Sequence, residues 1–221
     1  MRRRQTSESI VVFSQELAWK LIGLGIIAVL CGSLVGYLAN AMGAEGALIG
    51  VGATQITLLV AFFNARLLGL PELNFKEGCI FGGLCAGAMA VFVCGGLAQL
   101  LEVFGFSPQP QPIIEQLRVA GGLELPMMAL LGVFLGPIVE EIYFRGWWLK
   151  LLERKLGALT SVFVLAIVFA LLHFSIGAFA GLFVLGVLLG FAALRWGIIS
   201  AIIGHMLFNL ITFLAVRGGW V

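Results

Sequence analysis

The chain has few charged residues and no aspartate. Of its 221 residues, 61% are hydrophobic and only 11% are charged, and the mean hydropathy is +1.11. A soluble domain needs more charge than this to cover its surface, so the composition indicates a protein whose solvent is lipid. The missing aspartate excludes an aspartyl catalytic dyad. The net charge is only +2 and the basic residues are dispersed, which excludes a nucleic-acid-binding surface of the usual kind.

Cysteine is also scarce, and its spacing does not indicate a metal site. The four cysteines all lie in apolar runs: Cys31, Cys79, Cys85 and Cys94. They form no CxxC pair and no Cys/His spacing typical of zinc ligands, so we interpret them as small packing residues. The chain also lacks a GxSG sequence, which speaks against a serine nucleophile.

Seven apolar stretches are long enough to cross a bilayer as helices. A spanning helix needs about 20 apolar residues and satisfies its own backbone hydrogen bonds. The stretches are 18–39, 47–66, 78–101, 125–149, 157–175, 177–194 and 197–216. They predict an all-α fold, a polytopic transmembrane helical bundle of about seven spans. The 177–194 stretch is short and follows its predecessor closely, so a tight hairpin and a re-entrant pair both stay open.

The length favours a single integral-membrane domain over 1–221. With the N-terminus in the cytoplasm, most basic residues fall on that side: Arg2, Arg3, Arg4, Lys20, Arg66, Lys76, Lys150, Arg154, Lys155 and Arg195. The other side has two basic residues, Arg118 and Arg217. It also has four acidic residues: Glu45, Glu102, Glu115 and Glu124. This asymmetry predicts a cytoplasmic N-terminus and an external C-terminus. The segment Met1–Arg4 is similar to the start of a signal peptide, but the apolar stretch begins only near Leu21 and no clean cleavage site follows. We therefore expect a retained first helix.

Proline and glycine mark the remaining features. The segment Ser107–Pro112 is too rich in proline for a helix, and a short amphipathic piece follows at Ile113–Val119. Glycines recur four residues apart in several stretches, which predicts close packing of helix backbones. No longer repeat is present, so an inverted-repeat transporter has little support.

Polar groups interrupt the apolar stretches in three segments, 137–148, 169–174 and 204–209. An ionisable group at membrane depth costs at least about 2.5–3.5 kcal/mol, so such groups are usually functional or paired. Glu141 and Arg145 are four residues apart, which places them on one helix face at ion-pair distance. Glu140 is rotated by about 100° from Glu141 around the helix axis, so its carboxylate reaches Arg145 less easily. We predict that Glu141 is paired and that Glu140 is free to act as a general base.

Both histidines of the chain lie in apolar runs. His205 and Asn209 are four residues apart and leave the last helix on one face. At about 1.5 Å per residue, Glu140, His173 and His205 fall at a similar depth, provided that the helix carrying His173 is tilted or begins deeper. The sequence therefore predicts one polar cavity that contains the acid and both imidazoles.

The three polar motifs, in this order and in apolar surroundings, resemble those of the CAAX protease and bacteriocin-processing family (CPBP, or Abi) of intramembrane proteases. They read Glu140-Glu141-x-x-x-Arg145, Phe169-x-x-x-His173 and His205-x-x-x-Asn209. The motifs place the protease core at about 125–216. The N-terminal half is similar only in being hydrophobic, and no function is carried onto it.

The resemblance implies an intramembrane endopeptidase that hydrolyses a peptide bond in a membrane-associated protein or peptide. It implies that Glu140 and His173 activate a water and that His205 and Asn209 stabilise the oxyanion. A carboxylate base and polar donors in a dry site suit this chemistry. Glu141 and Arg145 would support the helix rather than react.

The sequence does not decide whether the reaction uses a metal ion. The favoured mechanism is glutamate-dependent and needs none, but the family has also been described as metal-dependent. Glu140, His173 and His205 could then form a His₂Glu zinc site, although the chain has no HExxH sequence.

Two other functions compete with proteolysis. One is a non-enzymatic immunity or scaffold protein that keeps the motifs for folding, and the other is a proton-coupled transporter with Glu140 and His173 as its relay. The expected partners are the bilayer and a peptide or protein substrate within it. Prenylated C-termini, bacteriocin leaders and membrane-bound signalling peptides are all open as substrates. The chain shows no eukaryotic targeting signal, so the expected location is a prokaryotic cytoplasmic membrane.

Overall fold

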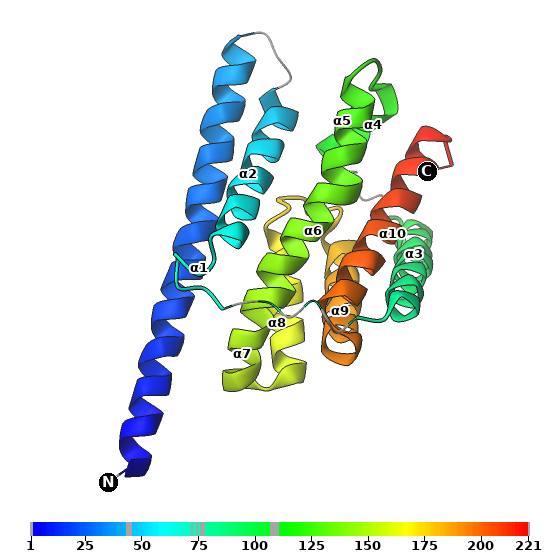
Figure 1. The fold of residues 1–221 in the computed structure, drawn as a ribbon. Coiled ribbons are helices and arrows are strands. Elements are labelled where there is room, and N and C mark those ends of the chain that lie inside the picture. Colours follow the sequence, from blue (N-terminus) through cyan, green and yellow to red (C-terminus); the bar gives the residue numbers. More distant parts are fainter. Residues whose placement is uncertain are drawn as a thin grey trace. The chain divides into compact units, whose positions relative to one another are not determined.

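The computed structural model describes the backbone of residues 2–42, 46–71, 73, 75, 78–106 and 111–220, and their side chains from residue 15 onward except 47 and 112. Every regular element in these ranges is a helix, which confirms the all-α class (Figure 1). The elements in chain order are α1 (Arg2–Ala41), α2 (Gly46–Phe63), α3 (Ile80–Val103), α4 (Pro112–Val119), α5 (Glu124–Ala129), η1 (Leu130–Leu135), α6 (Gly136–Glu141), η2 (Ile142–Trp148), α7 (Leu149–Leu156), α8 (Ala158–Leu171), α9 (Phe179–Trp196) and α10 (Ile198–Arg217).

The apolar helices correspond to the predicted spans. Within the described ranges, five helices are long and apolar enough to cross a membrane: Gln15–Ala41, Ile80–Val103, Glu124–Leu156, Phe179–Trp196 and Ile198–Arg217. Two shorter apolar helices, Leu48–Phe63 and Ala158–Leu171, account for the other two predicted stretches. The polytopic helical bundle is therefore confirmed.

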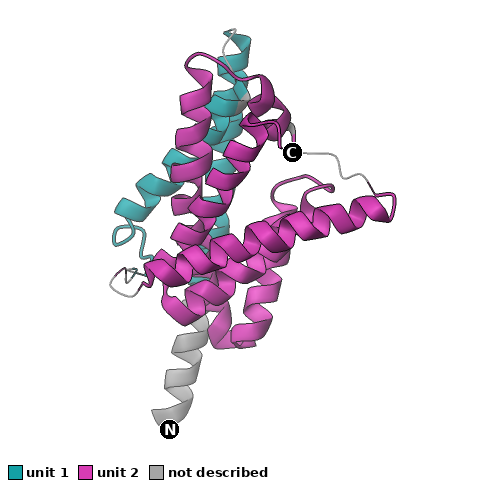
Figure 2. Ribbon diagram, turned by 90° about the vertical axis from the view of Figure 1, so that its right-hand side faces the viewer, with its two compact units in different colours: residues 1–73 teal, residues 74–221 magenta. Residues whose placement is uncertain are grey.

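The chain divides into two compact units, Met1–Leu73 and Asn74–Val221 (Figure 2). The first contains α1 and α2, and the second contains α3 to α10. The predicted protease core, about 125–216, lies inside the second unit. The single domain expected over 1–221 stays a prediction, and each unit is described by itself.

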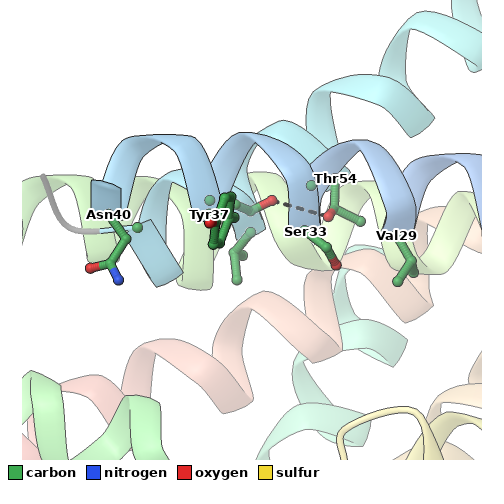
Figure 3. A pocket seen from close by; sticks show the side chains of 10 residues that line it. Val29, Ser33, Tyr37, Asn40 and Thr54 are labelled. Atoms are coloured by element: carbon green, nitrogen blue, oxygen red, sulfur yellow. Dashed lines mark hydrogen bonds between the residues drawn. The ribbon is translucent and has the colours of Figure 1, made fainter. Parts of the chain in front are cut away.

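In the first unit, glycines bring α1 and α2 into close contact. A Cβ atom on Gly36 would lie 2.6 Å from the carbonyl oxygen of Gly46, and one on Gly50 would lie 2.8 Å from that of Gly32. A groove of about 520 Å³ runs beside this contact, with Ser33, Tyr37 and Asn40 spaced along α1 (Figure 3). The groove is lined by Val29, Gly32, Ser33, Gly36, Tyr37, Asn40, Gly46, Gly50, Val51 and Thr54. None of the predicted site residues is among them.

In the second unit, glycines have the same role between α3 and α10 and between α8 and α9. A Cβ on Gly87 would lie 2.5 Å from the carbonyl oxygen of Gly204, and one on Gly186 would lie 3.0 Å from Ala166. Figure 2 shows α3 crossing the other helices of this unit at a steep angle. Close packing at the glycines is therefore confirmed at these contacts. It does not extend to Gly181, where an added Cβ would meet nothing within 4 Å.

The predicted helix 125–149 continues from Glu124 to Leu156, but it is not a regular α-helix. Two π-helical segments, η1 and η2, flank α6. In η1, the N–H of Gly136 donates to the carbonyl of Leu131, five residues back. The next residue, Pro137, has no N–H to continue the pattern. Segments of π-helix occur often at functional sites, and here they enclose the turn that carries Glu140 and Glu141.

The α8–α9 hairpin differs from the sequence expectation. The sequence predicts that 177–194 is the short member, whereas α9 has 18 residues and α8 only 14. Helix α8 ends at Leu171 because a turn follows, in which Phe174 adopts φ 50°. A 14-residue helix rises only about 21 Å. The connection after α8 therefore lies level with α6, short of the end of the unit where α4 and the C-terminus lie (Figure 1).

The amphipathic piece predicted at Ile113–Val119 is confirmed as α4. Arg217, the last residue of α10, holds the end of α4 by donating hydrogen bonds to the carbonyls of Leu117, Arg118 and Ala120. Several predicted features lie outside the described residues: Ser107–Pro110 of the proline-rich segment, Glu45, Lys76 and the side chains of Arg2, Arg3 and Arg4.

Candidate active site

Glu141 is the centre of a buried polar network. Its Oε1 accepts a hydrogen bond from Nη1 of Arg145 at 2.9 Å. The same oxygen lies 2.8 Å from Nδ1 of His205 on α10. Exposure is 0% for Glu141 and 3% for both Arg145 and His205. The predicted ion pair is confirmed, and the structure adds His205 to it.

Arg145 connects this network to two further helices. Its Nη2 donates to the carbonyl of Gly186 on α9 at 3.0 Å. Its Cζ lies 5.1 Å from the ring centroid of Phe169 on α8, within cation–π distance. The buried guanidinium thus has a charge partner, a carbonyl and an aromatic face, which offset the cost of its desolvation.

Phe169 links the two histidines. Its ring centroid lies 4.6 Å from that of His173 and 5.8 Å from that of His205. Its carbonyl oxygen lies 2.8 Å from Nδ1 of His173. A carbonyl only accepts hydrogen bonds, so Nδ1 carries the proton and the neutral His173 ring keeps an unprotonated Nε2. In this tautomer, Nε2 of His173 can accept a hydrogen bond.

Asn209 contacts the helix that carries the glutamates. Its Nδ2 donates to the carbonyl of Gly132 at 2.8 Å. Gly132 lies in η1, and the residue five positions later is Pro137, which has no N–H for this carbonyl. His205 and Asn209 thus both reach the same helix from α10, as the prediction of a shared face requires.

Glu140 differs from Glu141 in having no ion pair with any of the described residues. Its side chain is half-buried, and Oε2 is a buried atom with no hydrogen-bond partner. The pairing of Glu141 agrees with the geometry, although its Oε2 is also a buried atom without a hydrogen-bond partner. The role of Glu140 as a free base stays a prediction. No hydrogen bond joins Glu140 to His173 or His205 in the described part of the chain, so their common cavity stays a prediction.

The alternative zinc site does not fit this geometry. Across the described residues, no three His, Cys, Asp or Glu side chains are gathered in a way that could hold a metal ion. Zinc requires nitrogen and oxygen ligands at about 2.0–2.2 Å. Glu140, His173 and His205 do not meet this requirement as placed, and Nδ1 of His205 is already bonded to Glu141.

Comparison with known proteins agrees with the order of the motifs. Residues 122–211 match the family described as Type II CAAX prenyl endopeptidase Rce1-like. This part of the chain is Rce1-like. The Rce1-like segment contains all three motifs, which confirms the resemblance to the CAAX proteases. No curated protein and no solved structure matches the chain.

The Rce1-like segment runs from just before α5 into α10 and leaves residues 1–121 without an assigned relative. Together with the apolar helices, the match indicates a multi-pass integral membrane protein whose residues 122–211 are similar to the Rce1-like family.

Two supports of the site are absent from the sequence prediction. The carbonyl of Gly186 holds Arg145, and nothing in a glycine on another helix signals that contact. The carbonyl of Gly132 holds Asn209, and here Pro137 is a usable signal because it withholds an N–H from the preceding turn.

Proposed function

We propose that the Rce1-like segment is an intramembrane endopeptidase that hydrolyses a peptide bond in a membrane-bound protein or peptide. The observation that carries this proposal is the different ion pairing of two adjacent glutamates, Glu140 and Glu141. Oε1 of Glu141 is held by Arg145 and His205, whereas no ion pair holds Glu140 among the described residues. Oε2 is a buried atom without a hydrogen-bond partner in both glutamates, so the two differ in their ion pairing. A buried polar atom without a partner is costly, so its retention favours a role in binding a water or substrate.

In this mechanism, a water lies between Glu140 and Nε2 of His173. The water oxygen attacks the carbonyl carbon of the scissile bond while Glu140 takes one of its protons. His173 accepts a hydrogen bond from the other O–H and orients the nucleophile. The tetrahedral intermediate then collapses, the C–N bond breaks, and Glu140 returns the proton to the leaving amine.

Asn209 and His205 stabilise the oxyanion of that intermediate. One N–H of the Asn209 amide is used by Gly132, so the other is the donor for the substrate oxygen. Preorganised donors in a dry site contribute the most to this type of catalysis because they need no rearrangement as charge develops.

The substrate class follows from the family description. We propose a peptide with a prenylated CAAX C-terminus as the first candidate, with cleavage before the last three residues. A bacteriocin leader or a membrane-bound signalling peptide is the alternative. The glutamate mechanism requires no cofactor.

We also propose that the N-terminus is cytoplasmic. Helix α7, with Lys150, Arg154 and Lys155, and the α9–α10 junction next to Arg195 lie at one end of the second unit (Figure 1). This grouping supports the positive-inside assignment for that end. A reporter fused after Val221 tests it, because the assignment requires the fused reporter to be external.

The decisive experiment uses the full chain in liposomes with a farnesylated CAAX peptide, in water enriched in ¹⁸O. We expect release of the C-terminal tripeptide and one ¹⁸O in the new carboxylate of the other product. The unprenylated peptide is the control for substrate class. Intact prenylated and unprenylated peptides after prolonged incubation, together with no cleaved membrane peptide in cells, would contradict the proposal.

A further inference from the structure

His205 is bound to the protein through one specific ring nitrogen. Nδ1 lies 2.8 Å from Oε1 of Glu141, and both side chains are almost completely buried. We propose that Glu141 is a positioning residue for His205: its carboxylate fixes the Nδ1 proton and stabilises the imidazolium that donates from Nε2 to the oxyanion. The inference rests on the proposed function and assigns Glu141 a part in the reaction beyond its ion pair.

The direction of the hydrogen bond limits what His205 can do. A carboxylate that also holds Arg145 accepts from Nδ1, so the Nδ1 proton points at Glu141. A neutral ring has only one N–H, and its Nε2 is then an acceptor. Donation to an oxyanion from Nε2 requires the doubly protonated ring, and a carboxylate at 2.8 Å stabilises that positive charge.

Arg145 keeps the carboxylate in place for this task. Its Nη1 binds the same Oε1 that contacts His205, while Nη2 is held by the carbonyl of Gly186. The guanidinium is also packed over the ring of Phe169, which in turn contacts His205 edge-on. Among the described residues, His205 thus has the carboxylate of Glu141 at Nδ1 and the ring of Phe169 beside it, and Glu141 is the acceptor for its Nδ1 proton.

Glu141 could instead serve only to hold the helix through its ion pair with Arg145. Two double variants distinguish this structural role from the positioning role. Glu141→Met with Arg145→Met (E141M/R145M) removes both charges and the acceptor that Glu141 provides for His205. Glu141→Gln with Arg145→Met (E141Q/R145M) also removes both charges but keeps an amide oxygen for Nδ1. Neither leaves a buried charge without a partner, which is the usual cause of misfolding at such a site. Equal melting temperatures in detergent show that the two variants are matched.

The first readout is the protonation state of the ring. The chain has only two histidines, so ¹⁵N spectra of the labelled protein contain two imidazoles, and His173→Gln assigns them. We expect a protonated Nδ1 at His205 in the unmodified chain and in E141Q/R145M. In E141M/R145M, His205 loses its preference for Nδ1 while the His173 signals stay unchanged.

The second readout is turnover of the farnesylated peptide. We expect kcat of E141M/R145M to fall by at least about 100-fold with little change in KM, since loss of the residue that orients a catalytic histidine has large effects of this kind. E141Q/R145M should retain a kcat at least about 10-fold higher than that of E141M/R145M, because the amide oxygen keeps the orientation of the His205 ring.

Equal kcat values for the two double variants would overturn the inference, as would an unchanged His205 spectrum in E141M/R145M. If either variant fails to fold, the spectrum of the unmodified chain decides alone, because an unprotonated Nδ1 at His205 is incompatible with the proposal. The proposed function is tested separately. Full activity of Glu140→Gln would reject Glu140 as the general base and with it the proposed mechanism. An inactive Glu140→Gln variant, combined with equal kcat values for the two double variants, would reject only the role of Glu141.

Discussion

Nδ1 of His205 lies 2.8 Å from Oε1 of Glu141, although the two residues are 64 positions apart in the chain. This contact joins the first polar motif to the third and makes α6 and α10 parts of one network. Arg145 extends the network to α9 through Gly186, and Phe169 brings in the helix that precedes His173. The site is therefore held by buried polar contacts rather than by apolar packing alone.

Removing one member of the buried ion pair should destabilise the protein. Glu141→Ala leaves Arg145 without its counterion at 3% exposure, and Arg145→Ala does the same to Glu141 at 0%. Each should cost roughly 3–5 kcal/mol and lower the amount of folded protein in the membrane. Membrane yield and the melting temperature in detergent measure the effect.

The double variant E141M/R145M is the control for this prediction. It should regain most of the yield because it has no unpaired buried charge. Normal yield of both single variants would show that the pair contributes little and that the two glutamates do not have separate roles.

The contact between α8 and α9 provides a second test. A Cβ on Gly186 would lie 3.0 Å from Ala166, so Gly186→Leu should separate the helices and disturb the carbonyl that holds Arg145. Overpacking of this kind costs roughly 1–3 kcal/mol and should lower the melting temperature. Gly181→Leu, on the same helix but with nothing within 4 Å, is the matched control and should be close to neutral. Equal effects of the two variants would reject this packing.

Asn209 should affect turnover more than stability. Asn209→Leu keeps the volume but removes the donor, so kcat should fall roughly 100- to 1,000-fold, as for loss of one oxyanion donor. Loss of the bond to Gly132 should cost only about 1 kcal/mol of stability. Thr212→Val is the control on the same helix, because the hydroxyl of Thr212 donates to the carbonyl of Phe208 within α10. Unchanged turnover in Asn209→Leu would remove this residue from the oxyanion site.

Metal removal tests the cofactor assignment. The described side chains form no three-ligand cluster, and Nδ1 of His205 is committed to Glu141. We expect cleavage of the farnesylated peptide to survive exhaustive chelation and dialysis. Activity that is lost on chelation and restored by zinc, but not by calcium, would contradict the glutamate mechanism.

Much of the fold could be predicted from sequence because lipid imposes simple rules. Apolar runs of spanning length must be helices, and each predicted stretch has a helix in the structure. The end of α8 was harder to predict, since no glycine or proline in residues 172–176 marks the turn, and Phe174 adopts the left-handed conformation there without being glycine. The π segments also escape prediction, because hydrophobicity does not report on hydrogen-bond register.

The candidate site was partly predictable for a similar reason. The spacing of Glu141 and Arg145 determines that they meet on one helix face. The partners supplied by other helices depend on how α6, α9 and α10 are rotated and shifted against one another. No spacing within a helix contains that information, so the contacts of Glu141 with His205 and of Arg145 with Gly186 emerge only from the structure.

The role of Glu140 as the general base is tested by cleavage of the farnesylated peptide by the Glu140→Gln variant in liposomes. Glu153→Gln, an exposed glutamate on α7, is the matched control. We expect Glu140→Gln to insert normally, keep its melting temperature and release no product, while Glu153→Gln cleaves at the normal rate. Full cleavage by a correctly folded Glu140→Gln variant would rule out Glu140 as the base, because the adjacent carboxylate, Glu141, is held by Arg145 and His205.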